Sequence, residues 1–245
     1  MEQGKYYIDE DGRCVIPEGV TEINWYEFSG CTSLKCVVIP NSVTTIGKYA
    51  FRGCSSLKSV DIPNSVIMID EHAFEDCTSL ATIDIPNSVT YIGESAFAGC
   101  TSLKNIDIPN SVTYIGGRAF EGCTSLETFH IPNSVTKIGK EVYPFDDIYK
   151  RIDNSAFNSC ISLRNVIIPE SVTEISEIGF EGCTSLRSIH FEHEKIDEIV
   201  IKENALDSID KSQCTLYIPS GTRWAYRHHP VLGQFKNIEI ETKKE

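Results

Sequence analysis

The sequence contains no long hydrophobic run. No stretch approaches the roughly 18 consecutive apolar residues of a transmembrane helix, so membrane insertion is not expected. The first ten residues also lack the basic segment and following apolar segment of a secretory signal. Two interpretations stay open: a cytoplasmic protein, or an exported protein whose signal segment has been removed.

Basic residues are in the minority. The chain carries 22 Lys and Arg against 35 Asp and Glu, a formal net charge of -13 at pH 7. Nucleic acids and anionic membrane surfaces both select a basic protein face, so neither is expected as a partner. The simplest role of the excess negative charge is solubility.

Motifs that carry chemistry are missing as well. The sequence has no C-x-x-C, G-x-S-x-G or H-E-x-x-H, and no glycine-rich loop that cradles phosphate. We therefore predict that the protein is not an enzyme and has no cofactor or metal. The weaker alternative is a hydrolase or fortuitous metal site near the C-terminal end, where four histidines gather: His190, His193, His228 and His229.

What the sequence does contain is a 23-residue period. Its copies begin at Cys31, Cys54, Cys77, Cys100, Cys123, Cys160 and Cys183, and six of these seven spans follow C-[TSI]-S-L-x-x-[VIF]-x-I-P-[NE]-S-V. A unit this small cannot bury its own apolar side chains, so the copies must stack around one continuous core. The period therefore predicts a repeat solenoid.

Each coil is predicted to open with one short strand. Leu103, Ile106 and Ile108 have the spacing of inward-facing strand positions, and Pro109 ends the strand. A tight helical or 3₁₀ turn is expected to precede the next copy. Because every coil returns in the same direction, the strands must run parallel, about 4.8 Å apart, with right-handed crossovers. We expect one parallel sheet across about nine coils, on the order of 40 Å long.

Two columns at the corners of the coil are rich in glycine, with Asn, Asp and Ser as replacements. Asn and Asp tolerate a positive φ better than other residues, so both columns are predicted to be left-handed corners. The first column is Asn24, Gly47, Asp70, Gly93, Gly116, Asp153 and Ser176. The second column is Gly30, Gly53, Asp76, Gly99, Gly122, Ser159 and Gly182.

Seven of the ten cysteines form a column of their own at the start of each copy. Neighbouring copies about 4.8 Å apart lie within the range that a disulfide allows, so distance alone does not exclude bridging. An inward-pointing column in register is better explained as free thiols that pack as small hydrophobic groups. Cys14, Cys36 and Cys214 lie outside this column.

The unit resembles the BspA-like leucine-rich repeat, whose 23 residues share the L-x-x-[LVI]-x-[IL]-P, I-G-x-x-A-F and terminal G-C elements. The resemblance covers about residues 8 to 236. It implies a bacterial, often surface-exposed protein for adhesion and recognition. The partner implied is a protein, such as host matrix or another bacterial surface protein, with a glycan as a second class. A cytoplasmic scaffold or effector is the alternative function, and a monomer is expected.

A single elongated domain over residues 1–245 is expected, with a short leader at 1–7. Residues 8–30 are predicted to be an N-terminal capping repeat, 31–182 the regular repeats, and 183–245 a degenerate repeat with a C-terminal cap. The cap is predicted to contain a strand at 214–219, a short helix at 222–229 and a last strand at 235–240.

Outward-facing columns supply the first candidate binding residues. One column along the strands contains Asp61, Asp84, Asp107 and His130. The aspartates either share a cation or stay hydrated beside neighbouring lysines. On the other wall of the coil, adjacent copies carry tyrosines, which form either a binding hot spot or a cover over the core edge: Tyr91 and Tyr114.

The fifth copy supplies the remaining candidates, because it is 14 residues longer than the others. Insertions in repeat proteins map to loops, so residues 139–152 are expected to form one. This insertion places aromatic residues beside mixed charge: Tyr143, Phe145 and Tyr149. Such a composition suits a binding surface, and an insertion folded back onto the solenoid is an equal alternative.

Overall fold

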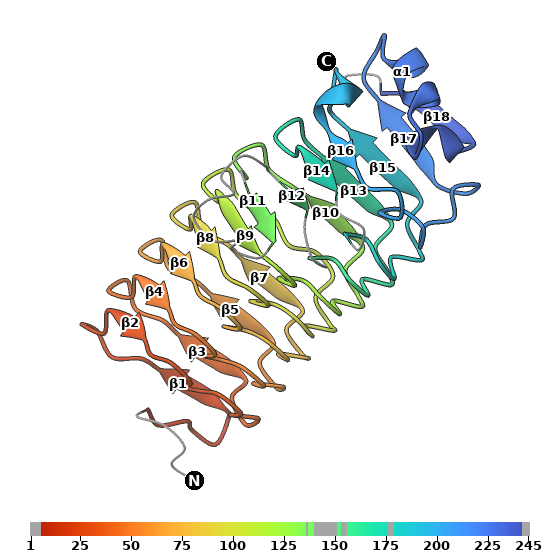
Figure 1. The fold of residues 1–245 in the computed structure, drawn as a ribbon. Helices are drawn as coiled ribbons and strands as arrows, with labels where there is room; N and C mark the ends of the chain where they lie inside the picture. Colours follow the sequence, from red (N-terminus) through yellow and green to blue (C-terminus); the bar gives the residue numbers. More distant parts are fainter. Residues whose placement is uncertain (1–5, 136, 140–150, 153–155, 176–178, 242–245) are drawn as a thin grey trace.

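The computed structural model describes residues 6–135, 137–139, 151–152, 156–175 and 179–241. These residues form one elongated β-solenoid of about nine turns, whose coils follow one another along a single axis (Figure 1). Every strand pair between coils is parallel. The predicted fold class is therefore confirmed, with additions that the sequence pattern did not indicate.

One long face of the solenoid, called the strand face below, carries the first strand of each coil. Its N-terminal part is a four-stranded sheet of β1 (Arg13–Val15), β3 (Cys36–Val38), β5 (Ser59–Asp61) and β7 (Thr82–Asp84). Its C-terminal part is a five-stranded sheet of β10 (Thr128–His130), β13 (Asn165–Ile168), β15 (Ser188–Phe191), β17 (Thr215–Ile218) and β18 (Asn237–Ile240).

The strand face is interrupted between these two sheets. The prediction of one continuous sheet on this face is therefore wrong. In the coil between them, residues 105–107 form no strand. Elsewhere on this side, a serine of each Pro-Asn-Ser turn donates a hydrogen bond of 2.5–2.7 Å to a valine carbonyl one coil earlier: Ser42, Ser65, Ser88 and Ser134. The hydroxyl of Ser111 is buried without such a partner, and so is that of Ser171 in the corresponding Pro-Glu-Ser turn.

A second face carries a continuous nine-stranded sheet that the sequence analysis did not predict. In spatial order it contains β2 (Glu22–Ile23), β4 (Thr45–Ile46), β6 (Met68–Ile69), β8 (Tyr91–Ile92), β9 (Tyr114–Gly116), β11 (Lys137–Gly139), β12 (Arg151–Ile152), β14 (Glu174–Ile175) and β16 (Val200–Ile201). Most of these strands have only two residues, too few to show an alternating pattern in the sequence.

The long fifth copy contributes two strands to this second face and one to the strand face. Ile138 on β11 pairs with Ile115 on one side and Ile152 on the other, and Ile152 then pairs with Ile175. On the strand face, β10 pairs directly with β13. The insertion therefore adds a strand to one face only. The prediction that residues 139–152 form a loop is therefore wrong at both ends of that range, because Gly139 belongs to β11 and Arg151–Ile152 form β12. Residues 140–150 lie outside the described residues.

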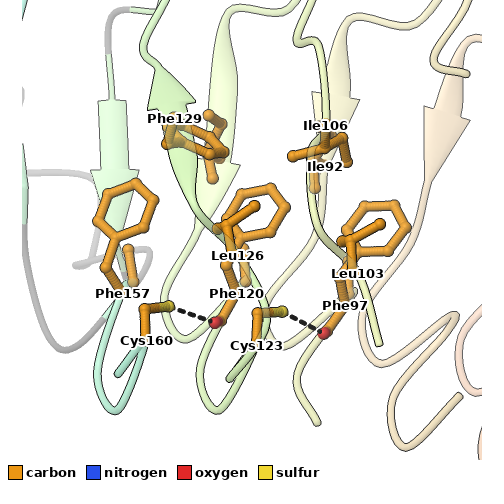
Figure 2. Packing of buried hydrophobic residues seen from close by; sticks show 14 of the residues in the cluster. Ile92, Phe97, Leu103, Ile106, Phe120, Cys123, Leu126, Phe129, Phe157 and Cys160 are labelled. Carbon is orange, nitrogen blue, oxygen red and sulfur yellow. Dashed lines mark hydrogen bonds between the residues drawn. The ribbon is translucent and has the colours of Figure 1, made fainter. Parts of the chain in front are cut away.

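A ladder of phenylalanine rings runs through the core (Figure 2). Its members are at most 1% exposed and stack at centroid distances of 5.1–6.0 Å: Phe28, Phe51, Phe74, Phe97, Phe120, Phe157 and Phe180. Tyr6, which the sequence analysis placed in a short leader, stacks on Phe28 at 5.8 Å. The ladder gives each coil the same internal cross-section as its neighbours.

The second glycine column is left-handed as predicted, with φ between 58° and 77° at Gly30, Gly53, Asp76, Gly99, Gly122, Ser159 and Gly182. The first column is not left-handed at its described positions. Its glycines are explained by close approach instead, since a Cβ on Gly47 would lie 2.6 Å from the Ile23 carbonyl oxygen, and one on Gly116 would lie 2.3 Å from the Glu94 nitrogen. The positive φ falls two residues later, at Tyr26, Tyr49, His72, Ser95 and Arg118.

The C-terminal cap has the predicted order of strand, short helix and strand. The 3₁₀ helix η1 (Ile196–Glu198) lies in the degenerate coil, and β17 is followed by α1 (Arg223–His228), the 3₁₀ helix η2 (Leu232–Gln234) and β18. Tyr226 on α1 is fully buried and donates a hydrogen bond of 2.9 Å to the His193 carbonyl. The cap therefore closes the C-terminal end of the core (Figure 1).

Candidate functional site

The strand face presents its side chains in exposed columns around a buried one. Ser59 and Asp61 on β5 are exposed on either side of the buried Val60, and β7 repeats this pattern. Asp61 lies directly opposite Asp84 in the parallel register. The geometry therefore brings two of the three predicted aspartates together.

The other two predicted residues of this column are separated from that pair. Asp107 is exposed, but it lies in the coil that has no strand on this face, so it does not extend the Asp61–Asp84 register. His130 on β10 is exposed and lies opposite Ile167 on β13, in the second sheet. Within the described part of the chain, no group of three or more His, Cys, Asp or Glu residues comes together in a way that could hold a metal ion.

Tyr91 and Tyr114 pair on the second face, as the sequence spacing predicted. They lie opposite each other on β8 and β9, and their rings stack with centroids 4.7 Å apart and planes within 6°. Each ring is half-buried, so the pair offers ring edges and hydroxyls more than open ring faces. The insertion aromatics Tyr143, Phe145 and Tyr149 lie outside the described residues.

A longer aromatic column at the N-terminal end escaped the sequence analysis. Tyr26 stacks on Tyr49 at 4.7 Å, and Tyr49 stacks on His72 at 4.5 Å, with planes within 4°. All three occupy the left-handed corner position. The signal that would have revealed them is the residue two places before each core phenylalanine, which is aromatic in only these three coils.

Charged side chains hold this aromatic column in place. Lys48 lies 5.8 Å from the centroid of the exposed Trp25 ring and 2.9 Å from Glu71. Arg52 lies 5.7 Å from the centroid of the Tyr49 ring, and its Nε is 2.6 Å from Glu75. Because the rings are fixed by these contacts, little side-chain entropy remains to be lost when a partner binds.

The four C-terminal histidines do not form a common site. His190 Nδ1 lies 3.0 Å from Glu241, whereas His193 Nε2 lies 2.7 Å from the Val172 carbonyl. His228 Nδ1 lies 2.7 Å from the Trp224 carbonyl, and His229 Nδ1 accepts bonds from the amides of Val231 and Leu232. Burial lowers the pKa of both His193 and His229. Each ring therefore has its own local role.

The cysteine column bonds to the core backbone. Each thiol from the second copy onward donates to the carbonyl of the phenylalanine one coil earlier, at 3.0–3.3 Å, as Figure 2 shows for Cys123 with Phe97 and Cys160 with Phe120. All ten cysteines are free thiols, and only Cys36 is exposed. Burial raises the pKa of Cys77 to about 12, so its thiol stays protonated and able to donate at neutral pH.

Stacked coils around a phenylalanine ladder, with exposed columns along the strands, define a solenoid repeat protein. The BspA type leucine rich repeat region matches residues 21–148 and 144–222, with six copies. The chain therefore belongs to the BspA-type leucine-rich repeat family. Leucine-rich repeats of this kind generally mediate protein interactions and are generally not enzymes. A search of curated proteins finds no match.

Solved structures of bacterial proteins share this architecture. A leucine-rich repeat protein of T. pallidum is 33% identical over 74% of this chain and 80% of its own, with a TM-score of 0.63. A leucine-rich cell surface protein of Faecalibacterium prausnitzii is 28% identical over 75% of this chain and 60% of its own, with a TM-score of 0.51. The pneumococcal vaccine antigen PcpA, at 18% identity over 94% of this chain and 68% of its own, shares the fold with a TM-score of 0.51. None of the described helices has the length and apolar character that a bilayer crossing requires.

Proposed function

We propose that this protein is a non-enzymatic adhesion module that binds a partner protein over the strand face and the 139–152 insertion. Membership of a repeat family whose members generally mediate protein interactions supports this proposal. The F. prausnitzii relative is a leucine-rich cell surface protein, which supports a location of this protein on the cell surface. A host matrix protein or another bacterial surface protein is the partner class that follows.

The observation that carries the proposal is the contrast between the two sides of each strand. Inward positions repeat almost unchanged, as Val37, Val60 and Ile83 illustrate, and all are buried. The outward positions vary from coil to coil, with exposed Val38, Asp61, Asp84 and His130 along one column. Packing demands the uniform side but places no such demand on the varied side. A rigid scaffold with a varied exposed face is suited to recognition.

The chemistry of the face points to a partner with a basic patch. Asp61 and Asp84 lie side by side on β5 and β7, the last two strands of the N-terminal sheet, on a chain of net charge -13. Complementary charge raises the rate of encounter and excludes partners of the same sign. Binding at the strand face is therefore expected to weaken as the ionic strength rises.

A panel of purified matrix and bacterial surface proteins, measured by surface plasmon resonance, tests this proposal. For any member that binds, the double substitution of Asp61→Lys and Asp84→Lys is expected to weaken the affinity by at least about tenfold. The matched control is Glu203→Lys with Asp207→Lys, which changes the charge equally on exposed residues near the C-terminal end. Equal losses from the two pairs would show that net charge, and not the strand face, governs binding.

The contribution of the insertion is separable by deletion. Removing residues 139–152 joins Ile138 to Asp153 and restores the 23-residue spacing, and β11 is then free to pair with β14 in place of β12. The deleted chain is expected to remain folded by circular dichroism and to bind its partner more weakly. Unchanged affinity after both the deletion and the aspartate substitutions would refute the proposal that the strand face and the insertion bind the partner.

A cytoplasmic scaffold is the alternative that shares this binding chemistry but differs in compartment. Fractionation of the native host with an antibody against the chain separates the two. Accessibility of the protein to added protease on intact cells is expected for the surface protein. Protection until the cells are lysed would favour the scaffold.

A further inference from the structure

Adjacent coils are joined at the aromatic corner by a fixed set of backbone hydrogen bonds. The amides of Tyr26, Phe28 and Gly30 donate to carbonyls of the following coil at 2.7–3.2 Å, and later coils repeat the pattern. In the opposite direction, Thr44 donates to the Thr21 carbonyl at 2.8 Å and Gly47 donates to the Ile23 carbonyl at 2.9 Å. Each coil therefore offers two donors and three acceptors to the coil before it.

The first described coil carries the same groups, and no described coil lies in front of them. Its donors are the amides of Thr21 and Asn24, and its acceptors are the carbonyls of Trp25, Glu27 and Ser29. None of these five groups has a hydrogen-bond partner among the residues that the structure describes. The surface that couples coils to one another is thus repeated intact at the N-terminal end.

Exposed aromatic side chains lie beside these backbone groups of the first coil. Trp25 is 63% exposed and Tyr26 is 54% exposed, whereas Tyr49 in the next coil is half-buried. One face of the Tyr26 ring stacks on Tyr49, and the aromatic column does not continue on its other face within the described chain. Thr21, Asn24, Trp25 and Tyr26 are called the N-terminal corner below.

The rest of this end is covered, so the opening is local. Tyr6 stacks on Phe28 and covers the end of the core ladder. Ile8 forms an antiparallel bridge with Cys14, which occupies the outer edge of β1. Among the described residues, only the side of the coil that contains β2 and the aromatic column has coupling groups without a partner.

The C-terminal end is not a matching surface for this corner. Arg223 of α1 donates to the Ile238 carbonyl, and Arg227 donates to the carbonyls of Phe235 and Lys236. These bonds use backbone acceptors at the last strand that a further coil would need. Head-to-tail stacking of a second copy on this corner is therefore disfavoured, which favours a segment of another polypeptide as the occupant.

We propose that the N-terminal corner binds an extended peptide segment of a partner protein, which adds to the solenoid as a partial coil. The segment would pair with β2 through the Thr21 and Asn24 amides and the Trp25 carbonyl. It would place an aromatic side chain on the open face of Tyr26. Continuity with an interface that this chain already forms between all its coils supports the choice of an extended peptide over other ligands. The site is separate from the strand face, so failure of one leaves the other intact.

A labelled peptide of this chain's own coil tests the site. The probe is fluorescein-labelled TTIGKYA, the sequence of residues 44–50, whose backbone groups already form these bonds inside the molecule. Fluorescence anisotropy with the full-length protein is expected to show saturable binding. Tyr26→Ala is expected to weaken it by about tenfold or more, as loss of an aromatic anchor does. Tyr26→His is expected to retain most of it, because His72 fills the same position in another coil.

Two matched controls distinguish binding at the N-terminal corner from nonspecific binding of the probe. Trp224→Ala removes a more exposed aromatic at the other end and is expected to leave binding unchanged. A probe methylated on the amide nitrogen of its tyrosine cannot donate to the Trp25 carbonyl and is expected to lose binding. Equal binding of the methylated probe, or an equal effect of Trp224→Ala, would overturn the proposal.

Amide hydrogen exchange decides whether the chain fills the corner itself. The Thr21 and Asn24 amides are expected to exchange fast in the free protein and slowly with the probe. Slow exchange before the probe is added would mean that the chain's own residues occupy the site, and no saturable binding would mean that no peptide does. Either result would refute the proposed occupant.

Discussion

The two ends of the solenoid are capped to different extents. At the C-terminal end, Tyr226 of α1 is fully buried. Two arginines of the same helix donate hydrogen bonds to carbonyls of the last strand and of the residues before it. At the N-terminal end, Tyr6 covers the core, but Trp25 and Tyr26 remain more than half exposed. Capping thus has two parts, burial of the apolar core and satisfaction of the coupling backbone. Within the part of the chain that the structure describes, only the C-terminal end shows both.

The largest expected effect contrasts the interior with the open end. Phe97→Ala removes a ring that stacks on Phe74 and Phe120 in a core that cannot easily collapse, at a cost of about 3–5 kcal/mol. Because coupling runs between nearest neighbours, the loss should also broaden or split the unfolding transition. Phe28→Ala should cost less, since its outer neighbour Tyr6 is only half-buried. Calorimetry that finds the two variants equally destabilised, each with one sharp transition, would contradict this ranking.

The next effect tests how the C-terminal end is held closed. Tyr226→Phe keeps the buried ring but leaves the His193 carbonyl without its donor, which should cost about 1–3 kcal/mol. The matched control is Trp224→Ala on the same helix, whose side chain is 73% exposed. Urea unfolding monitored by circular dichroism measures both. A larger loss for the control would show that the exposed side of α1 holds the cap.

Alkaline pH should expose the buried thiols in a definite order, from the N-terminal end to the interior. Folding raises the pKa of the buried thiols above the usual 9.0, to about 11 for Cys14 and about 12 for Cys77 and Cys123. Below pH 9 both states hold these protons and the stability is intact. Above pH 9 the unfolded state ionises first, so each fully buried thiol such as Cys77 removes about 1.4 kcal/mol per pH unit until its folded pKa is reached.

Mass spectrometry after alkylation at stepped pH values reads this order directly. Cys36 should react at neutral pH because it is the exposed thiol, and Cys14 should follow at the N-terminal end. Cys100 should react late, because burial raises its pKa well above 9.0. Modification of Cys100 before Cys14 in the native protein would show that the interior opens first. The unfolded chain should react at all ten positions.

The smallest effect concerns the exposed aromatics. Trp25→Ala should change the free energy of unfolding by no more than about 0.5 kcal/mol, because the side chain is 63% exposed. Thermal unfolding followed by fluorescence of the remaining tryptophan measures it. A substantially larger loss would mean that Trp25 closes the end in the way that Tyr226 does. The two ends would then be alike.

Much of the candidate site, on the strand face and on the second face, was predictable, because it follows from strand alternation and the repeat period. The buried Val60 between exposed Ser59 and Asp61, and the stacked Tyr91 and Tyr114, both follow from a period of 23 residues and in-register stacking. The repeat period and strand alternation did not predict the stacked column of Tyr26, Tyr49 and His72. Its position depends on the backbone turning left-handed two residues after the first glycine column, and side-chain type does not report that angle.

By itself, the sequence determined that this protein is a parallel solenoid with a phenylalanine ladder, a buried cysteine column and a C-terminal cap. These follow from repetition, since identical coils can bury identical side chains only by stacking. The tertiary structure alone decided the rest: the second sheet, the interruption at residues 105–107, the extra strand β12, and the different closure of the two ends. Those features depend on which backbone groups of neighbouring coils meet, and a hydrogen bond between coils leaves no mark on the pattern of a single repeat.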